Sequence, residues 1–152
     1  MASRRWISNI AGTLLLSATF LGSASHAEDV STHETMGSVA RGIFTTAVVE
    51  REPRDDLASL PNDQYNIFFF SELANMAGQR VTHRWEYNGQ VMAEVSFQVG
   101  ADRWRTHSSK NLQPIWLGEW TVSVLDADMN VLSTHNFNYT VAPSPMPASI
   151  PN

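Results

Sequence analysis

The feature of this chain that most constrains its fold is a period-two alternation of apolar and polar residues on both sides of Asn88-Gly89. In residues 91–99 and again in residues 81–87, apolar side chains occupy alternate positions and mainly polar ones lie between them. Because successive side chains of a strand point to opposite faces, each run predicts a strand with one buried face. Asn-Gly readily takes the two positive φ angles of a type I′ turn. The sequence therefore predicts a β-hairpin.

Five more strands are predicted from the same pattern. A second hairpin is expected to join residues 120–124 to residues 131–141 through a polar turn at 126–130, and the other strands are expected at 42–49, 65–73 and 103–109. Seven short strands within about 100 residues, separated by turn signals, are typical of an antiparallel, immunoglobulin-like β-sandwich. We therefore predict an all-β fold of this kind. The chain has no cysteine, so this fold must be stable without a disulfide.

Residues 1–27 have the pattern of a cleavable signal peptide rather than of a folded domain. Arg4 and Arg5 precede an apolar run at residues 10–21, and Ser25-His26-Ala27 places small residues at both recognition positions of a cleavage site. The apolar run has 12 residues, whereas a membrane-spanning helix needs about 20. We therefore expect a periplasmic or secreted protein with no membrane span after cleavage. The two arginines fit general secretory export and, less well, twin-arginine export.

The rest of the chain divides into three parts by composition. Residues 28–38 are polar and predict a flexible lead-in, residues 39–141 contain the strands, and residues 142–152 hold four of the seven prolines and predict an extended tail. Cleavage after Ala27 removes two of the ten basic residues and none of the 15 acidic ones, which lowers the formal charge from −5 to −7. A protein with this charge lacks the positive field that nucleic acids require, so no nucleic-acid partner is expected.

Five stretches of residues 39–141 are distinctive in combination. They are Val39-Ala40-Arg41 with Phe44-Thr45-Thr46-Ala47, Arg51-Glu52-Pro53, His83-Arg84-Trp85-Glu86-Tyr87-Asn88-Gly89, Arg103-Trp104-Arg105 with Ser108-Ser109-Lys110, and Gly118-Glu119-Trp120-Thr121-Val122. Through them the segment resembles the bacterial family known as domain of unknown function 2914. The resemblance implies the domain boundaries and an exported setting, but no catalytic residues, because the family has no established activity. In the second hairpin turn, the resemblance implies a glycine at the position of Met129.

Basic residues gather in one part of the chain. Five of the eight that remain after cleavage fall within residues 80–110. Alternation places the four arginines of this segment on strand faces opposite to tryptophan side chains, which predicts that the arginines point outward. A guanidinium group binds carboxylate or phosphate through two parallel hydrogen bonds, so the segment predicts a surface for an acidic glycan, another anionic envelope component or a partner protein. The candidate residues are Arg80, Arg84, Arg103, Arg105 and Lys110.

Two alternatives to this binding surface stay open. Cross-strand ion pairs with Glu86, Glu94 and Asp102 would keep the sheet surface soluble without forming a binding site. Carbohydrate binding through aromatic side chains is the second alternative, although most of these side chains are expected to fill the core. Trp116 lies in a loop-like stretch, so it is the aromatic residue expected to be exposed.

The sequence contains no recognised catalytic or metal-binding pattern. His83 and His135 are predicted on inward strand faces, where hydrogen-bonded core histidines are expected rather than zinc ligands. Asp126, Asp128 and Asn130 begin like a calcium loop, but the glycine and the glutamate that such a loop requires are absent. We therefore expect a non-catalytic binding module without a cofactor or metal, and an uncharacterised hydrolase is the least favoured alternative.

Overall fold

The structure of this chain is a computed structural model, and it describes residues 36–144. The signal peptide predicted at 1–27, and the parts of the predicted lead-in and tail that fall within 28–35 and 145–152, lie outside the described residues. In the described part, no helix is long and apolar enough to cross a membrane. The strands are β1 (Ser38–Thr45), β2 (Val48–Val49), β3 (Glu52–Pro53), β4 (Ser59–Pro61), β5 (Asn66–Ala74), β6 (Arg80–Tyr87), β7 (Gln90–Gln98), β8 (Arg103–Asn111), β9 (Gly118–Leu125) and β10 (Val131–Thr140).

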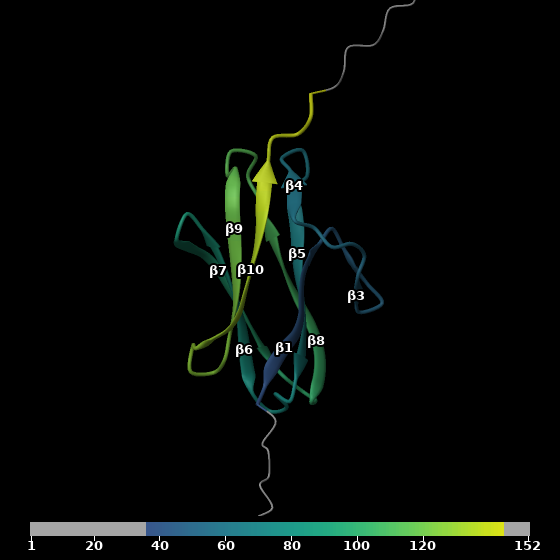
Figure 1. Ribbon diagram of the computed structural model, residues 1–152, viewed down its shortest axis with the longest axis vertical. Coiled ribbons are helices and arrows are strands. Elements are labelled where there is room, and N and C mark those ends of the chain that lie inside the picture. The colour runs from purple at the N-terminus through teal and green to yellow at the C-terminus, as the bar shows by residue number, and fades with distance from the viewer. Residues whose placement is uncertain (1–35, 145–152) are drawn as a thin grey trace, which may run out of the picture. The chain divides into compact units, whose positions relative to one another are not determined.

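Two β-sheets pack face to face over a shared core (Figure 1). One sheet has the order β1-β5-β8, and the other has the order β4-β10-β9-β6-β7. When the seven long strands are lettered in chain order, the neighbours A-B-E and C-F-G are those of constant-type immunoglobulin domains, whereas D pairs with C here and not with E. The predicted all-β sandwich of about seven strands is confirmed. It is not wholly antiparallel, because the short β4 pairs with β10 in parallel.

Both predicted hairpins are present. Asn88 and Gly89 have φ angles of 50° and 72° and join β6 to β7, which confirms the type I′ turn. In the β9–β10 hairpin, the carboxylate of Asp126 accepts a hydrogen bond from the backbone N–H of Asn130 (2.8 Å). Met129 in this turn has a φ of 67°. This left-handed conformation favours glycine, the residue that the family resemblance implies at this position.

The strand predicted at residues 42–49 is wrong by four residues at each end, since β1 runs from Ser38 to Thr45. The other six predicted strands agree with the structure to within two residues at each end. β1 ends at Thr45, after which the chain leaves the sheet and forms the separate β2–β3 hairpin. Asp55 stabilises the point where the chain leaves the sheet, since its carboxylate accepts hydrogen bonds from the Thr45 hydroxyl (2.6 Å) and the Thr46 backbone N–H (2.7 Å). Burial alone would raise the pKa of Asp55, but these hydrogen bonds lower it below its usual value.

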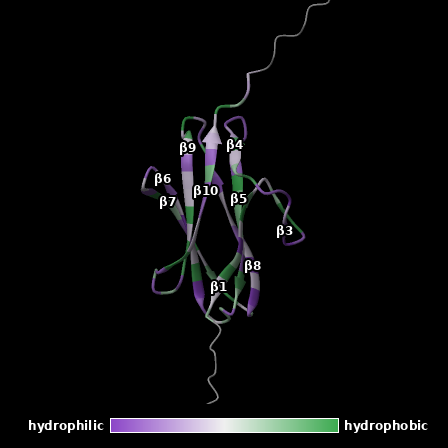
Figure 2. Cartoon of the chain, viewed as in Figure 1, coloured by the Kyte–Doolittle hydropathy of each residue, from purple (hydrophilic) through white to green (hydrophobic). Residues whose placement is uncertain are grey.

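The core lies between the inner faces of the two sheets. Hydrophobic and hydrophilic residues alternate along the strands, as Figure 2 shows, and the buried hydrophobic ones form one cluster. Phe44 of β1 connects the layers, because its ring centroid lies 4.7 Å from that of Phe137 on β10 and 6.0 Å from that of Trp85 on β6. Trp85 and Trp120 are fully buried. Aromatic packing of this kind stabilises the sandwich without a disulfide.

A buried polar contact also connects the two sheets. The imidazole of His83 on β6 is hydrogen-bonded to the hydroxyls of Ser71 on β5 (2.9 Å) and Ser108 on β8 (3.0 Å). Ser108 also accepts a hydrogen bond from the indole N–H of Trp85 (2.9 Å). Burial, and to a lesser extent two neighbouring histidines, lowers the pKa of His83 to about 3, so this imidazole is neutral. The interpretation of His83 as a hydrogen-bonded core histidine is confirmed.

Candidate anion-binding site

The structure divides the predicted basic residues between the two sheets. Arg80 and Arg84 lie on β6 in the five-stranded sheet, whereas Arg103 and Arg105 lie on β8 in the three-stranded sheet. Each pair alternates with residues that face the core, so the two pairs occupy the outer faces of different sheets. The predicted residues therefore do not form the single arginine-rich face that the sequence suggested.

Arg84 and Lys110 make contacts that stabilise the sandwich. The Nε of Arg84 donates to the carboxylate of Glu94 across the β6–β7 pair (2.7 Å), which confirms one of the cross-strand ion pairs expected from the sequence. The Nζ of Lys110 donates to the backbone carbonyl of Met92 on β7 (3.1 Å). These two cations are therefore engaged within the protein. Arg84 lies on the other sheet, and Lys110, although it is on β8, points to the opposite face from Arg103 and Arg105.

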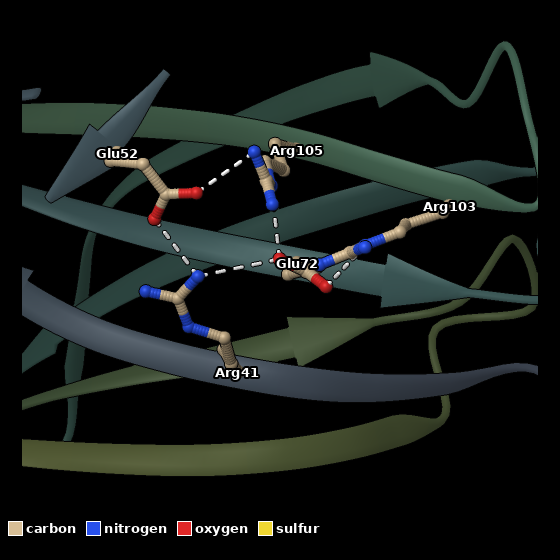
Figure 3. Close-up of polar contacts among 5 residues, drawn as sticks. All are labelled: Arg41, Glu52, Glu72, Arg103 and Arg105. Atoms are coloured by element: carbon tan, nitrogen blue, oxygen red, sulfur yellow. Dashed lines mark hydrogen bonds and ion pairs between the residues drawn. The ribbon is translucent and has the colours of Figure 1, made fainter. Parts of the chain in front are cut away.

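Three arginines surround the carboxylate of Glu72 on the outer face of the three-stranded sheet (Figure 3). Glu72 lies on β5, and its side chain is only 7% exposed. It accepts hydrogen bonds from the Nε of Arg103 (2.7 Å) and the Nε of Arg105 (3.0 Å), both on β8. Arg41 on β1 approaches the same carboxylate with its Nη1 at 3.4 Å. The carboxylate thus joins all three strands of this sheet.

A second carboxylate ties the β2–β3 hairpin to this face. Glu52 on β3 accepts a hydrogen bond from the Nη1 of Arg41 (2.9 Å) and pairs with the Nη1 of Arg105 (2.8 Å). The hairpin is thereby held beside the three-stranded sheet, where Figure 1 shows β3. The Arg41 guanidinium also lies 5.1 Å from the ring centroid of Phe70, which is close enough for a cation–π interaction. We call the five paired residues the arginine cluster: Arg41, Glu52, Glu72, Arg103 and Arg105.

Three groups of the arginine cluster, Glu72, Arg41 and Arg103, keep their charges across the physiological pH range. The hydrogen bond from Arg103, together with that from Arg105, outweighs the effect of burial and lowers the pKa of Glu72 to about 2. Arg41 and Arg103 have raised pKa values, chiefly because they donate hydrogen bonds to the carboxylates of the cluster. Glu72, Arg41 and Arg103 are therefore fixed charges near neutral pH.

Arg51 adds a fourth cation beside the arginine cluster. It lies between β2 and β3, and within residues 36–144 it makes no ion pair. Together with Arg103 and Arg105 it lines a hollow of about 230 Å³, which we call the arginine pocket. Arg103 pairs with Glu72 through its Nε and its side chain is 70% exposed, so among the described residues its terminal nitrogens remain free to donate. The pocket therefore offers unpaired guanidinium donors next to a paired network.

The turn that carries Arg51 has an unusual backbone. Val49 pairs with Glu52, so Glu50 and Arg51 are the two central residues of a tight hairpin turn. Their φ angles are 50° and 67°, a combination normally taken by Asn-Gly in a type I′ turn. For a residue with a Cβ this conformation costs on the order of 1 kcal/mol. Backbone strain of this kind concentrates at functional sites, and Arg51 is one of the residues that line the arginine pocket.

Trp116 belongs to an aromatic cluster and does not stand alone as an exposed ring. It is half-buried, and its ring centroid lies 5.8 Å from that of Trp120 and 6.5 Å from that of Tyr87. Its backbone carbonyl accepts a hydrogen bond from the indole N–H of Trp120 (3.0 Å). Packing against the core thus takes up much of the surface that a sugar ring would need for stacking.

The contact between Ser108 and His83 is not accessible to a substrate, since both side chains are enclosed between the sheets. Across residues 36–144, no three or more histidine, aspartate or glutamate side chains are grouped so as to hold a metal ion. The chemistry that the arginine pocket can perform is the binding of an anion through charge and hydrogen bonds.

Sequence reasoning missed four residues of this site, which are Arg41, Arg51, Glu52 and Glu72. Glu72 lies in a strand of largely apolar residues, and nothing in chain order connects it to Arg103, which is 31 positions away. One signal was present, because three of the stretches that carry the family resemblance contain Arg41, Arg51-Glu52 and Arg103-Trp104-Arg105. Only the fold brings these three stretches to one face.

No curated protein matches this chain in sequence. Similar solved structures include two of the sensor domain of the anti-sigma factor RsgI4 in Pseudobacteroides cellulosolvens, one of a shorter and one of a longer form of the domain. The shorter has 10% sequence identity and a TM-score of 0.46, and the match covers 74% of this chain and 100% of that one. The longer has 10% identity and a TM-score of 0.45, with coverage of 76% and 98%.

The sequence model of one family also matches part of this chain. The family is described as protein of unknown function (DUF2914), and the matching residues are 78–139. They extend from just before β6 nearly to the end of β10 and leave β1 to β5 outside the match. The resemblance recognised in the sequence is confirmed over this span. The match covers less than half of the chain, and over residues 78–139 the chain is similar to the DUF2914 family of proteins of unknown function.

Proposed function

We propose that this chain is an exported, non-catalytic binding module that holds an anionic group in the arginine pocket. The observation that carries the proposal is the convergence of Arg51, Arg103 and Arg105 on one hollow of about 230 Å³. Export rests on the signal peptide predicted at residues 1–27, which would direct the module to the periplasm or out of the cell. A phosphorylated or acidic envelope component, or an acidic partner protein, would supply the anionic group there.

The chemistry of the pocket suits a phosphate or a carboxylate. A guanidinium group donates in a planar fork that matches two oxygens of either anion. Glu72 already orients Arg103 and Arg105, so a ligand has less side-chain freedom to remove when it binds. The formal charge of the whole chain is −5, so a positive site is a local feature that attracts anions to one face.

The alternatives receive less support from the geometry. Carbohydrate binding would require an open aromatic face, whereas the ring of Trp116 is half-buried against Trp120 and Tyr87. A hydrolase would require an accessible nucleophile or acid–base pair, whereas Ser108 and His83 are enclosed in the core. Binding without catalysis is therefore the function that we favour.

Calorimetric titration with inorganic phosphate at low salt tests this function. The variants Arg51→Gln and Arg80→Gln each remove one positive charge, but Arg80 lies on the other sheet, so it is the matched control. We expect Arg51→Gln to weaken phosphate binding about tenfold, the usual effect of losing a hydrogen bond to a charged group. Arg80→Gln should leave the affinity unchanged. Added sodium chloride should weaken binding by the unaltered protein.

Arg103 and Arg105 are less suitable test positions, because replacing them would also leave Glu72 without its partners and change stability. Equal weakening by Arg51→Gln and Arg80→Gln would contradict the proposal, since net charge would then explain the result. An unaltered protein that binds no phosphate would contradict it as well.

A further inference from the structure

A second and larger hollow adjoins the arginine pocket. Its volume is about 420 Å³, which lies within the range of small-molecule binding sites. Arg51 and Arg105 line both hollows, so the two are neighbours that share a boundary of guanidinium groups. We call the larger hollow the apolar pocket, since Val48, Phe70 and Phe97 give it an apolar lining beside the polar Thr106 and His107.

The apolar lining comes from three separate elements. Val48 lies on β2, Phe70 on β5 and Phe97 on β7. The hollow therefore extends from the outer face of the three-stranded sheet toward the edge of the other sheet, where β7 lies. Val48 and Phe97 are half-buried, so each retains surface that a bound group can cover. Removing such surface from water favours an apolar ligand group over a polar one.

We propose that the ligand of this site is an amphiphilic anion. Its phosphate or carboxylate binds in the arginine pocket, and an apolar chain or ring attached to that group fills the apolar pocket. This inference rests on the proposed function and specifies the class of ligand. A purely ionic ligand would leave the apolar pocket in contact with water, and a neutral one would leave the guanidinium of Arg51 without an anionic partner.

Calorimetric titrations with inorganic phosphate, hexyl phosphate, hexanoate and hexanol test this class. We expect hexyl phosphate to bind about 10- to 100-fold more tightly than inorganic phosphate, because each buried methylene group contributes about fourfold. Hexanol has the same chain without a charge, so it should bind at least about tenfold more weakly than hexyl phosphate. Hexanoate carries a carboxylate instead of a phosphate, so it tests the head group. If hexanoate also binds tightly, the inference extends from phosphates to carboxylates.

Two neighbouring substitutions separate the apolar pocket from the arginine pocket. Val48→Phe should fill the apolar pocket and remove the extra affinity for hexyl phosphate, while the affinity for inorganic phosphate stays unchanged. Val49→Phe adds the same side chain at the next residue, which is 49% exposed, and should change neither affinity. Thermal denaturation checks that both variants are folded. If Val48→Phe does not fold, Val48→Thr is the second variant. It keeps the volume of the side chain, and its hydroxyl should reduce the affinity gain of hexyl phosphate over inorganic phosphate.

The outcomes distinguish this inference from the proposed function. Equal affinities for hexyl phosphate and inorganic phosphate would overturn the inference and leave the proposed function intact. Hexanol binding as tightly as hexyl phosphate would also overturn it, because the guanidinium groups would then contribute nothing. The absence of binding by every anion would overturn both. Retention of the hexyl phosphate gain in a folded Val48→Phe variant would count against the apolar pocket as the site of the chain.

Discussion

Glu72 is almost enclosed by protein and is nevertheless ionised. Arg103 and Arg105 donate to it at 2.7 and 3.0 Å, and Arg41 approaches at 3.4 Å, so cationic donors replace the water that the carboxylate loses. Removing one partner of a buried ion pair of this kind strongly destabilises the protein, because the remaining charges are left without a partner. The residue therefore couples the stability of the three-stranded sheet to the geometry of the arginine pocket.

Glu72→Gln keeps the shape of this side chain and removes its charge. We expect the free energy of unfolding to fall by about 1 to 3 kcal/mol, since the arginines lose their charged acceptor. The pKa of Glu72 is lowered from 4.5 to about 2. The stability contributed by its ionised form is therefore fully present above 4.5 and is lost as the pH falls from 4.5 toward 2.

Urea unfolding of Glu72→Gln and the unaltered protein, at about pH 7 and about pH 3, checks this expectation. The difference between the two proteins should be smaller at the lower pH. Glu94→Gln is the control, because the ion pair of Glu94 with Arg84 is partly exposed and its loss should cost less than about 1 kcal/mol. A difference for Glu72→Gln that is the same at both pH values would show that its charge is not the cause.

His83 makes stability sensitive to pH in a higher pH range than Glu72 does. Burial lowers its pKa from 6.5 to about 3, so the folded protein does not take up the proton that the unfolded chain binds below 6.5. Its contribution to stability is present above 6.5 and is lost as the pH falls toward 3, by up to about 1.4 kcal/mol per pH unit. His83→Gln retains hydrogen-bonding groups without titrating. Between about pH 7 and about pH 5, this variant should lose less stability than the unaltered protein in urea unfolding.

His135 contributes to the same pH dependence, because burial also lowers its pKa. The His83→Gln variant should therefore keep part of the slope of stability against pH and not all of it. An unchanged slope in this variant would contradict the role assigned to His83.

At the scale of elements, two tight hairpin turns of this molecule take the same backbone form with different residues. The β6–β7 turn has Asn88 and Gly89 at its centre, and the β2–β3 turn has Glu50 and Arg51, with positive φ at all four residues. Asn-Gly is the residue pair that this backbone prefers. Arg51 thus occupies the position that Gly89 fills in the other turn. The β2–β3 hairpin is less stable with arginine there than it would be with glycine, but the arginine places a cation at the arginine pocket.

Arg51→Gly should therefore raise stability while it weakens phosphate binding. We expect a gain of about 0.5 kcal/mol in the free energy of unfolding. Glycine relieves the strain of the left-handed backbone, but part of this gain is offset because glycine also raises the conformational entropy of the unfolded chain. Met129→Gly is the matched control, because Met129 has the same φ of 67° in the β9–β10 turn. It should stabilise the protein similarly and leave phosphate binding unchanged. Urea unfolding and phosphate titration of both variants check these outcomes, and weaker binding by Met129→Gly would contradict them.

The long strands could be predicted from the sequence, whereas the short ones could not. Period-two alternation needs several residues to be visible, so the strands of two or three residues at β2, β3 and β4 left no readable pattern. These strands depend on distant partners instead. β4 pairs in parallel with the end of β10, and Leu60 at its centre is buried in the core. The β2–β3 hairpin depends on Asp55 and on the ion pairs of Glu52.

At the scale of the whole molecule, the order of strands decides which charges meet. Arg80 and Arg103 belong to one basic segment of the chain, yet β6 and β8 lie in different sheets, so they face opposite sides of the sandwich. The same order brings β1, β5 and β8 side by side and collects Arg41, Glu72 and Arg105 from distant parts of the chain. A binding site assembled in this way has no compact sequence motif.

The sequence by itself determined the all-β class, the long strands and the β6–β7 and β9–β10 hairpins, because alternation and turn chemistry act between residues that are close in the chain. It also indicated that arginines of residues 80–110 point outward. Only the tertiary structure decided that Arg103 and Arg105 pair with Glu72, and that Arg51 joins them at one pocket. Those contacts depend on which strands become neighbours, and that is settled by packing of the whole core and not by local sequence.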